Sequence, residues 1–218
     1  MNAKVFKQMA HTMRMLADAV CFRWTGAELC ISQLSQNESV MSFISVPSTR
    51  LPACVSVDTE NLYKLAKGLR KDDVLELAST DRHFVLNASN KSGSRTYKLP
   101  LVDSVPLCKP DLSREYLCFA SFDSIAFYRA CRDVAYTHRS VELHTKGEEI
   151  QLKAGTEELN LNITLKGEGE LGECSFSLSS DQLLHIARFS HTSSVVKLFA
   201  CLGKPLVIAY DDSLFALK

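Results

Sequence analysis

Basic side chains recur at helical spacing in this chain, and such side chains bind phosphate groups. Between residues 4 and 20, at roughly 100° per residue, one apolar stripe consists of Val5, Met9, Met13, Leu16 and Val20. The opposite side carries Lys4, Lys7, His11 and Arg14. An ordinary exposed helix face mixes charges of both signs, whereas this one stays basic until Asp18. The pattern predicts an amphipathic helix with a surface for a polyanion.

The same division recurs in three more stretches, each with an apolar face on the other side. The basic side chains of these stretches are Lys64, Lys67, Lys71, Arg129, Arg132, Arg139 and Arg188. Contacts from Lys and Arg to phosphate hold duplex DNA without reading its sequence. The alternative to phosphate binding, which stays open for each residue, is that its charge is simply solvated on the helix surface and contributes little to stability.

Patterns for catalysis and for metal binding are missing. The eight cysteines include no CxxC pair, and neither they nor the six histidines have the spacing of zinc ligands. The chain has no glycine-rich phosphate loop, no HExxH and no GxSxG. A thiol hydrolase is conceivable, but the cysteines fall mostly within apolar segments, which is typical of buried free thiols. We therefore expect no metal, no cofactor and no enzyme activity.

Charge is segregated along the sequence. Lys plus Arg number 25 and Asp plus Glu number 25, so the formal net charge is zero and acid must balance the basic stripes. Much of it lies in the second half, at Glu142, Glu148, Glu149, Glu157, Glu158, Glu168, Glu170 and Glu173. This segregation indicates one surface for a polyanion and another that repels it. No apolar run approaches the roughly 18 residues of a membrane span, and no signal peptide is recognisable, so we expect an intracellular protein in a reducing compartment, without membrane contact.

The predicted elements repeat in two halves, each with alternating strands and two helices. Asp58 provides a cap for the second helix. In the second half, four separate strands are expected at 140–146, 149–155, 159–165 and 175–179. The proline-containing segment from Asp103 to Arg114 has no periodicity, which is typical of a linker. The sequence therefore predicts an internal duplication, with domains of residues 1–105 and 115–218 joined by a linker of residues 106–114.

Several motifs together resemble one protein family. They are LYKLAKGL (62–69), TYKLPLVD (96–103), FYRACRDV (127–134), EIQLKAG (149–155), LNLNITL (159–165) and KPLVIAYD (204–211). In this order and spacing they resemble the eukaryotic-type DNA sliding clamps, the family of proliferating cell nuclear antigen (PCNA), over nearly the whole chain. The chain stops at Lys218 without the family's acidic tail, and its linker is short, which favours a divergent or viral member.

The resemblance implies an α+β DNA clamp (processivity) fold of two similar domains, each with two helices packed on antiparallel sheets. Three subunits would close into a homotrimeric ring around duplex DNA, with the helices lining the hole. The basic positions that match the family are Lys7, Arg14, Lys64, Lys67, Arg129, Arg132 and Arg188, while Lys4, Lys71 and Arg139 join them from stripe position alone. Such a ring would tether DNA polymerase and other clamp-binding proteins during replication or repair, in the nucleus or at a viral replication site.

The resemblance also implies two kinds of protein contact. Subunits would pair through the strands 95–102 and 159–165, because an unpaired strand edge is a template for another chain. The positions concerned are Tyr97, Leu99, Leu161 and Ile163. A short partner peptide would dock into an apolar pocket formed by Leu34, Val40, Leu107, Pro205, Phe215, Ala216 and Leu217.

Three related functions stay open alongside the homotrimeric clamp. A checkpoint-type clamp subunit would assemble with different chains instead of with itself. A viral processivity factor of similar fold would bind DNA as a monomer or dimer without encircling it. A transcription accessory clamp is the third, and mass in solution separates a self-trimer from a monomer or an obligate hetero-assembly.

Overall fold

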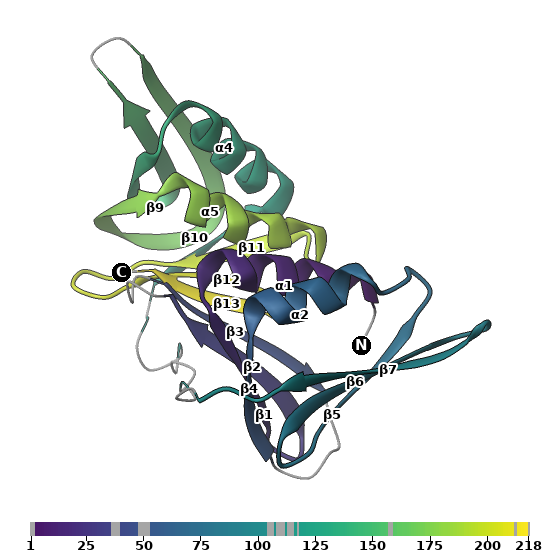
Figure 1. The fold of residues 1–218 in the computed structure, drawn as a ribbon. Coiled ribbons are helices and arrows are strands. Elements are labelled where there is room, and N and C mark those ends of the chain that lie inside the picture. The colour runs from purple at the N-terminus through teal and green to yellow at the C-terminus, as the bar shows by residue number, and fades with distance from the viewer. Residues whose placement is uncertain are drawn as a thin grey trace. The chain divides into compact units, whose positions relative to one another are not determined.

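The chain divides into two compact units, Met1–Cys108 and Lys109–Lys218, each with helices packed on antiparallel strands (Figure 1). The computed structural model describes residues 3–35, 40–47, 53–103, 107, 112, 116, 118–156, 159–211 and 213–217, with only the backbone of 46 and 47. Each unit carries two α-helices in its described part. The α+β class predicted from the sequence is therefore confirmed.

The first unit contains two antiparallel sheets and two helices. Its elements are α1 (Ala3–Leu16), β1 (Ala19–Trp24), β2 (Glu28–Leu34), β3 (Val40–Pro47), β4 (Ala53–Asp58), α2 (Thr59–Lys67), β5 (Val74–Ser79), β6 (His83–Asn90) and β7 (Gly93–Pro100). One sheet has the order β4-β1-β2-β3 and the other β5-β6-β7. The rings of Phe22 on β1 and Phe84 on β6 lie 4.5 Å apart between centroids, so the two sheets share one core.

Helix α1 is rotated and shortened relative to the predicted stripe. Phe6 is fully buried with Met9 and Met13, whereas Val5 is 40% exposed. Positions 6, 9 and 13 follow the three-to-four spacing of one helix face, and Val5 lies about 100° away from Phe6. The helix ends at Leu16, and Val20 belongs to β1. The assignment of Val5 and Val20 to the buried helix stripe was wrong.

Helix α2 begins where the sequence predicted. The Asp58 carboxylate accepts a hydrogen bond of 2.7 Å from the Asn61 backbone N–H, as expected of an N-cap. The Thr59 hydroxyl donates to the Ala17 carbonyl at 2.6 Å, which ties the start of α2 to the end of α1. The two helices therefore lie side by side (Figure 1).

The second unit repeats the scheme with longer strands. Its elements are β8 (Phe119–Asp123), α4 (Ser124–Thr137), β9 (Ser140–Gly155), β10 (Asn160–Ser179), α5 (Ser180–Ala187), a 3₁₀ helix (Arg188–His191), β11 (Val195–Phe199), β12 (Leu206–Tyr210) and β13 (Ser213–Leu217). The sheet order within the unit is β13-β12-β11-β8-β10-β9. Asp123 caps α4 and Ser179 caps α5 through hydrogen bonds to backbone N–H groups.

The four strands expected between residues 140 and 179 are two long ones. β9 and β10 form one antiparallel hairpin whose register shifts between Lys166 and Leu171 and again before Cys174. Glycines that resemble strand breaks in the sequence instead allow bulges. Gly169 has a φ of +122°, and a Cβ there would lie 2.4 Å from the Phe119 carbonyl oxygen of β8. The close approach of β8 thus requires a glycine, and the strand continues through it.

Candidate nucleic-acid interface

In the first unit, the predicted basic residues lie on the outer faces of α1 and α2. Lys4, Arg14, Lys64 and Lys67 are exposed and Lys7 is half-buried. Lys71 is also exposed, but it follows the end of α2 in a turn. The seven-residue spacing from Lys7 to Arg14 keeps both on one side of α1.

Glu60 and Tyr63 gather three of these cations into one cluster, which we call the Glu60 cluster: Arg14, Glu60, Tyr63, Lys64 and Lys67. Arg14 Nε forms an ion pair with Glu60 Oε2, and Lys64 Nζ lies 3.8 Å from Glu60 Oε1. The Tyr63 ring receives Arg14 Cζ and Lys67 Nζ, each 4.6 Å from its centroid. Cation–π contacts of this kind stabilise exposed cations by about 0.5–1 kcal/mol. The cluster therefore holds positive groups from two helices on one face.

Neither Glu60 nor Tyr63 is among the residues predicted to bind DNA. The four-residue step from Glu60 to Lys64 is the spacing of an ion pair on a helix, and this signal could have indicated the pair. No sequence signal indicated the contact with Arg14, because it joins residues 46 positions apart.

In the second unit, two of the predicted arginines lie on α4, and the other two follow the ends of α4 and α5. Arg129 is exposed on α4, and Arg132, one turn later, is half-buried. The guanidinium of Arg132 is 3.1 Å from Asp133 Oδ1 of the neighbouring position. Arg139, exposed, follows α4, and its carbonyl accepts a 3.1 Å hydrogen bond from the Ser180 N–H at the start of α5. Arg188, at the end of α5, has its Nη1 3.2 Å from His185 Nδ1.

Both strands predicted to join subunits have an unpaired side among the described residues. β7 pairs with β6 alone, so it is an edge strand. The first part of β10, Asn160–Lys166, pairs with β9, while β8 pairs only with Glu168–Glu170 further along. Side chains alternate along both segments, and Tyr97, Leu99, Leu161 and Ile163 are half-buried. Edges of this kind are templates for a further strand.

A buried carboxylate anchors β7 to the end of α2. The Asp73 side chain is buried and accepts hydrogen bonds from the Arg70 backbone N–H at 2.6 Å, Asn90 Nδ2 at 2.7 Å and Arg95 Nη2 at 2.5 Å. Arg95 Nη1 also donates to the Gly68 carbonyl at 3.0 Å. The Arg70 N–H, followed by Asn90 and Arg95, holds the pKa of Asp73 below its ordinary value. The Arg95 side chain on β7 thus pairs with a carboxylate whose ionised form these hydrogen bonds favour.

The residues predicted to form a peptide pocket lie in both units. Leu34 and Leu107 are half-buried, and Val40 is buried. Phe215, Ala216 and Leu217 form part of β13 and are 1–2% exposed. Pro205 is half-buried, and its carbonyl accepts a 2.8 Å hydrogen bond from the Tyr116 hydroxyl. The pocket stays a prediction.

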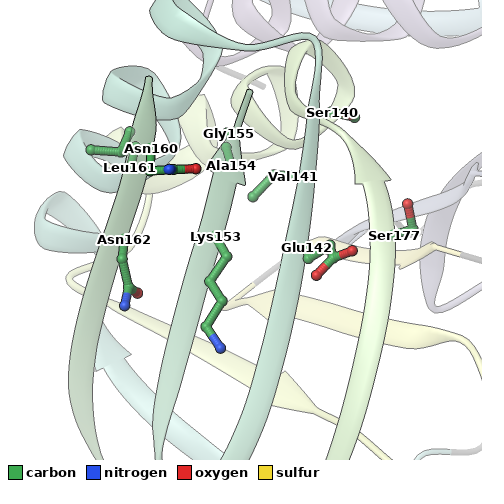
Figure 2. Close-up of a pocket in the computed structure, with 10 residues that line it drawn as sticks. All are labelled: Ser140, Val141, Glu142, Lys153, Ala154, Gly155, Asn160, Leu161, Asn162 and Ser177. Atoms are coloured by element: carbon green, nitrogen blue, oxygen red, sulfur yellow. The ribbon is translucent and has the colours of Figure 1, made fainter. Parts of the chain in front are cut away.

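A hollow of about 380 Å³ lies inside the β9–β10 hairpin (Figure 2). Figure 2 shows the first and last stretches of β9 beside it, with Glu142 from one and Lys153 from the other. Asn160, Leu161 and Asn162 from the start of β10 complete one side. Among the described residues, no group of three His, Cys, Asp or Glu side chains could hold a metal ion. The hollow contains none of the residues predicted to bind DNA.

The cysteines are free thiols wherever they are described. Burial raises the pKa of Cys131 above its ordinary value, and burial followed by a contact with Cys54 raises the pKa of Cys21 to about 11. A raised pKa keeps a thiol protonated and unreactive. Cys54, however, is exposed, contrary to the expectation of buried thiols. Cys108, Glu157 and Glu158 lie outside the described residues.

These features define a DNA clamp fold, because the whole chain superimposes on a known clamp. A crystal structure of the PCNA2–PCNA3 complex from Sulfolobus tokodaii matches with a TM-score of 0.83, at 17% sequence identity, over 99% of this chain and 96% of that one. No family model matches the sequence. In the described part of the chain, no helix has the length and apolar character to cross a membrane.

The chain is also similar in sequence to archaeal sliding clamps. The DNA polymerase sliding clamp of Pyrococcus horikoshii is 24% identical over 181 residues, which cover 78% of this chain and 72% of that protein. That of Thermococcus gammatolerans is 23% identical over 182 residues, with the same coverage. The chain is thus a distant homologue of the archaeal DNA polymerase sliding clamps, which are not enzymes. The resemblance to sliding clamps is confirmed, and these relatives are archaeal whereas the motifs indicated the eukaryotic type.

Proposed function

We propose that this chain is a subunit of a DNA sliding clamp that encircles duplex DNA and serves as a processivity factor. The observation that carries the proposal is the set of exposed Lys and Arg side chains on α1 and α2 of the first unit, together with the exposed Arg129 on α4 and Arg139 just after it in the second. Phosphate contacts of this kind are independent of base sequence, which is what a protein that moves along DNA requires. The partners are double-stranded DNA, DNA polymerase and further replication or repair proteins, in the nucleus or at a viral replication site.

The proposed ring is a homotrimer closed through its free strand edges. β7 of one subunit would pair with the Asn160–Lys166 segment of the next, a head-to-tail contact that forms a closed ring when the rotation closes. Tyr97, Leu99, Leu161 and Ile163 would then bury their half-exposed sides. Within a subunit, residues 106–114 would join domains of residues 1–105 and 115–218.

A ring of different chains is the second candidate. The structural relative is itself a complex of two different clamp proteins, which supports a hetero-assembly as an alternative.

Light scattering on the purified chain distinguishes a homotrimer from a subunit that assembles only with other chains. A mass near three times 24.3 kDa is expected for the homotrimer, and a monomer that trimerises only with other chains would overturn it.

Encirclement has a topological test. Retention of the loaded protein should be long on covalently closed circular DNA and short on linear DNA with free ends, because a ring leaves only by sliding off. Cutting the circle with a restriction enzyme should release the protein. Equal retention before and after the cut would contradict encirclement.

The DNA-binding face has a charge test. Lys64→Glu with Lys67→Glu should reduce the slope of log binding constant against log salt concentration by about two units at most, roughly one per lost phosphate contact. The matched control is Lys146→Glu with Lys153→Glu on β9, two exposed lysines outside the predicted DNA face. An unchanged slope in the first variant, or an equal loss in the control, would place the DNA surface elsewhere.

A further inference from the structure

Glu60 is the only carboxylate within the two helices of the first unit. α1 contains no Asp or Glu, and α2 contains Glu60 alone. Both oxygens of this one carboxylate face cations: Oε2 forms the ion pair with Arg14, and Oε1 lies 3.8 Å from Lys64 Nζ. A single acidic side chain therefore faces two of the residues predicted to contact phosphate, from two different helices.

The contacts of Glu60 are not needed to build α2 or to place Arg14. α2 is capped by Asp58, whose carboxylate accepts from the Asn61 N–H, and its start is tied to α1 through Thr59. Arg14 also stacks on the Tyr63 ring, and so does Lys67, each at 4.6 Å from the ring centroid. Exposed ion pairs contribute little to folding stability, and Glu60 and Arg14 are 44% and 37% exposed. The stability of the fold is therefore a weak explanation for Glu60.

The contacts have a larger consequence for DNA binding. Each Lys or Arg that neutralises a phosphate releases condensed counterions, and this release supplies most of the sequence-independent affinity. A carboxylate that already pairs with Arg14 and Lys64 competes with phosphate for both and repels the DNA backbone as well. The first unit therefore binds DNA with fewer available cations than its sequence contains.

We propose that Glu60 limits how tightly the first unit holds DNA, by occupying Arg14 and Lys64 in the absence of a phosphate contact. This inference rests on the proposed sliding-clamp function. A protein that slides must exchange phosphate contacts easily, and an internal carboxylate that recaptures each cation lowers the cost of releasing a phosphate. Glu60 thus acts on DNA binding only through Arg14 and Lys64, and Tyr63 keeps Arg14 on the DNA face.

The second unit lacks this arrangement in its described residues. Of its two helix carboxylates, Asp133 pairs with Arg132 of the adjacent position on the same helix, and Asp181, in the first turn of α5, forms no ion pair with another described residue. Arg129 and Arg139 are exposed and form no ion pair with another described residue. The limitation by a carboxylate shared between helices is therefore a property of the first unit.

The test is Glu60→Gln, which removes the charge and keeps the size of the side chain. Binding of a labelled duplex is measured by fluorescence anisotropy over a series of salt concentrations. We expect a slope of log binding constant against log salt that is steeper by about one unit, and low-salt binding that is tighter by roughly threefold to tenfold. The control is Glu170→Gln, an exposed residue of β10 with the same change in net charge, for which we expect little change.

Three results would overturn the inference. Equal tightening in Glu60→Gln and Glu170→Gln would reduce the effect to net charge. If Glu60→Gln leaves binding unchanged or weakens it, while the separate variant Lys64→Glu with Lys67→Glu does weaken binding, then Glu60 has no such role and the proposed clamp function stands. If no charge variant on α1 or α2 changes binding, the proposed DNA face fails and the inference fails with it.

A second variant separates the effect from any loss of folding. In the Arg14→Gln background, Glu60→Gln can release only Lys64, so its tightening should be smaller than in the wild type. This double-mutant cycle isolates the coupling between the two residues. Equal tightening in both backgrounds would contradict the role of Arg14.

Discussion

The helix pairs of the two units share an architecture and differ in their surface chemistry. α1 and α2 bury Phe6 and Leu62, while α4 and α5 bury Phe127 and Leu183, all at 0% exposure. On the outer side, the first pair connects its cations through the Glu60 cluster. In the second pair, Arg132 contacts Asp133 of the adjacent position and Arg188 contacts His185 three positions earlier. The number of basic residues in a sequence therefore does not by itself fix how much positive charge is available to a ligand.

The difference follows from the geometry of exposed charges. A contact between helices, such as Arg14 with Glu60, fixes side chains that would otherwise sample many rotamers. A contact within one helix leaves the side chain largely directed into solvent. We therefore expect the two units to share their folding energetics and to contribute unequally to DNA binding.

Substitution of a buried aromatic ring in the core of either unit gives the largest expected effect, a loss of folding stability. Phe6→Ala in the first unit and Phe127→Ala in the second should each lower the free energy of unfolding by about 3–5 kcal/mol, because each removes a fully buried ring. Trp24, the single tryptophan, is buried in the first unit, so its fluorescence during urea unfolding reports on that unit. Hydrogen exchange of backbone amides in the second unit reports on the unfolding of the second unit.

The control for the core is Val5→Ala, which changes a side chain of α1 that is 40% exposed. We expect a loss of less than about 1 kcal/mol. A loss as large as that of Phe6→Ala would contradict the rotated stripe of α1, and a strong inequality between Phe6→Ala and Phe127→Ala would break the equivalence of the two cores.

Charge reversal in the second unit gives the next largest effect. Arg129→Glu with Arg139→Glu should weaken duplex binding by roughly tenfold or more and lower the salt slope by about two units, because both arginines are exposed and each loses one phosphate contact. Anisotropy titrations compare this variant with Lys64→Glu plus Lys67→Glu. The first-unit variant should lose less, since Glu60 already occupies Lys64. A larger loss in the first unit would reverse the comparison.

Acid sensitivity should distinguish the first unit. Hydrogen bonds that favour the ionised form lower the pKa of Asp73 below its ordinary 3.8. The stability that it contributes is therefore fully present above the pKa of the unfolded chain and is lost as pH falls through the lower pKa of the folded one. In the second unit, none of the described ion pairs has a buried side chain.

Asp73→Asn checks this prediction. Trp24 fluorescence should show a lower urea midpoint for the variant at neutral pH, and the difference from the wild type should shrink as pH falls below about 4. Hydrogen exchange in the second unit should change little. A difference that stays constant with pH would show that Asp73 acts without its charge.

The smallest expected effect concerns Tyr63. Tyr63→Ala removes the surface on which Arg14 and Lys67 rest, with a cost of about 0.5–1 kcal/mol per contact. Duplex binding should weaken by a few-fold, because both cations lose their preferred position. Tyr63→Phe keeps the ring and should behave as the wild type in urea unfolding and anisotropy. Equal behaviour of Tyr63→Ala and the wild type would remove Tyr63 from the cluster.

Short-range chemistry made much of the fold predictable from the sequence. The Asp58 cap, the helices around Leu62 and Phe127, and the antiparallel strands of both halves follow from periodicity and capping, which act over a few residues. The division of residues 140–179 into four strands was wrong, because alternation alone does not distinguish a strand end from a β-bulge. β9 and β10 are each continuous only because β8 and the hairpin partner hold the bulged backbone.

The sequence by itself determined which residues carry charge and that charge follows helical spacing on α1, α2 and α4. Tertiary structure alone decided which charges are available, because Arg14 meets Glu60 and Tyr63 across two helices. It also decided that Val5 faces outward while Phe6 is buried, since the rotation of a helix depends on the sheet beneath it. Likewise Arg95 reaches Asp73 only through the packing of β7 beside α2. Contacts between residues far apart in sequence leave no local pattern, and the packed chain selects them.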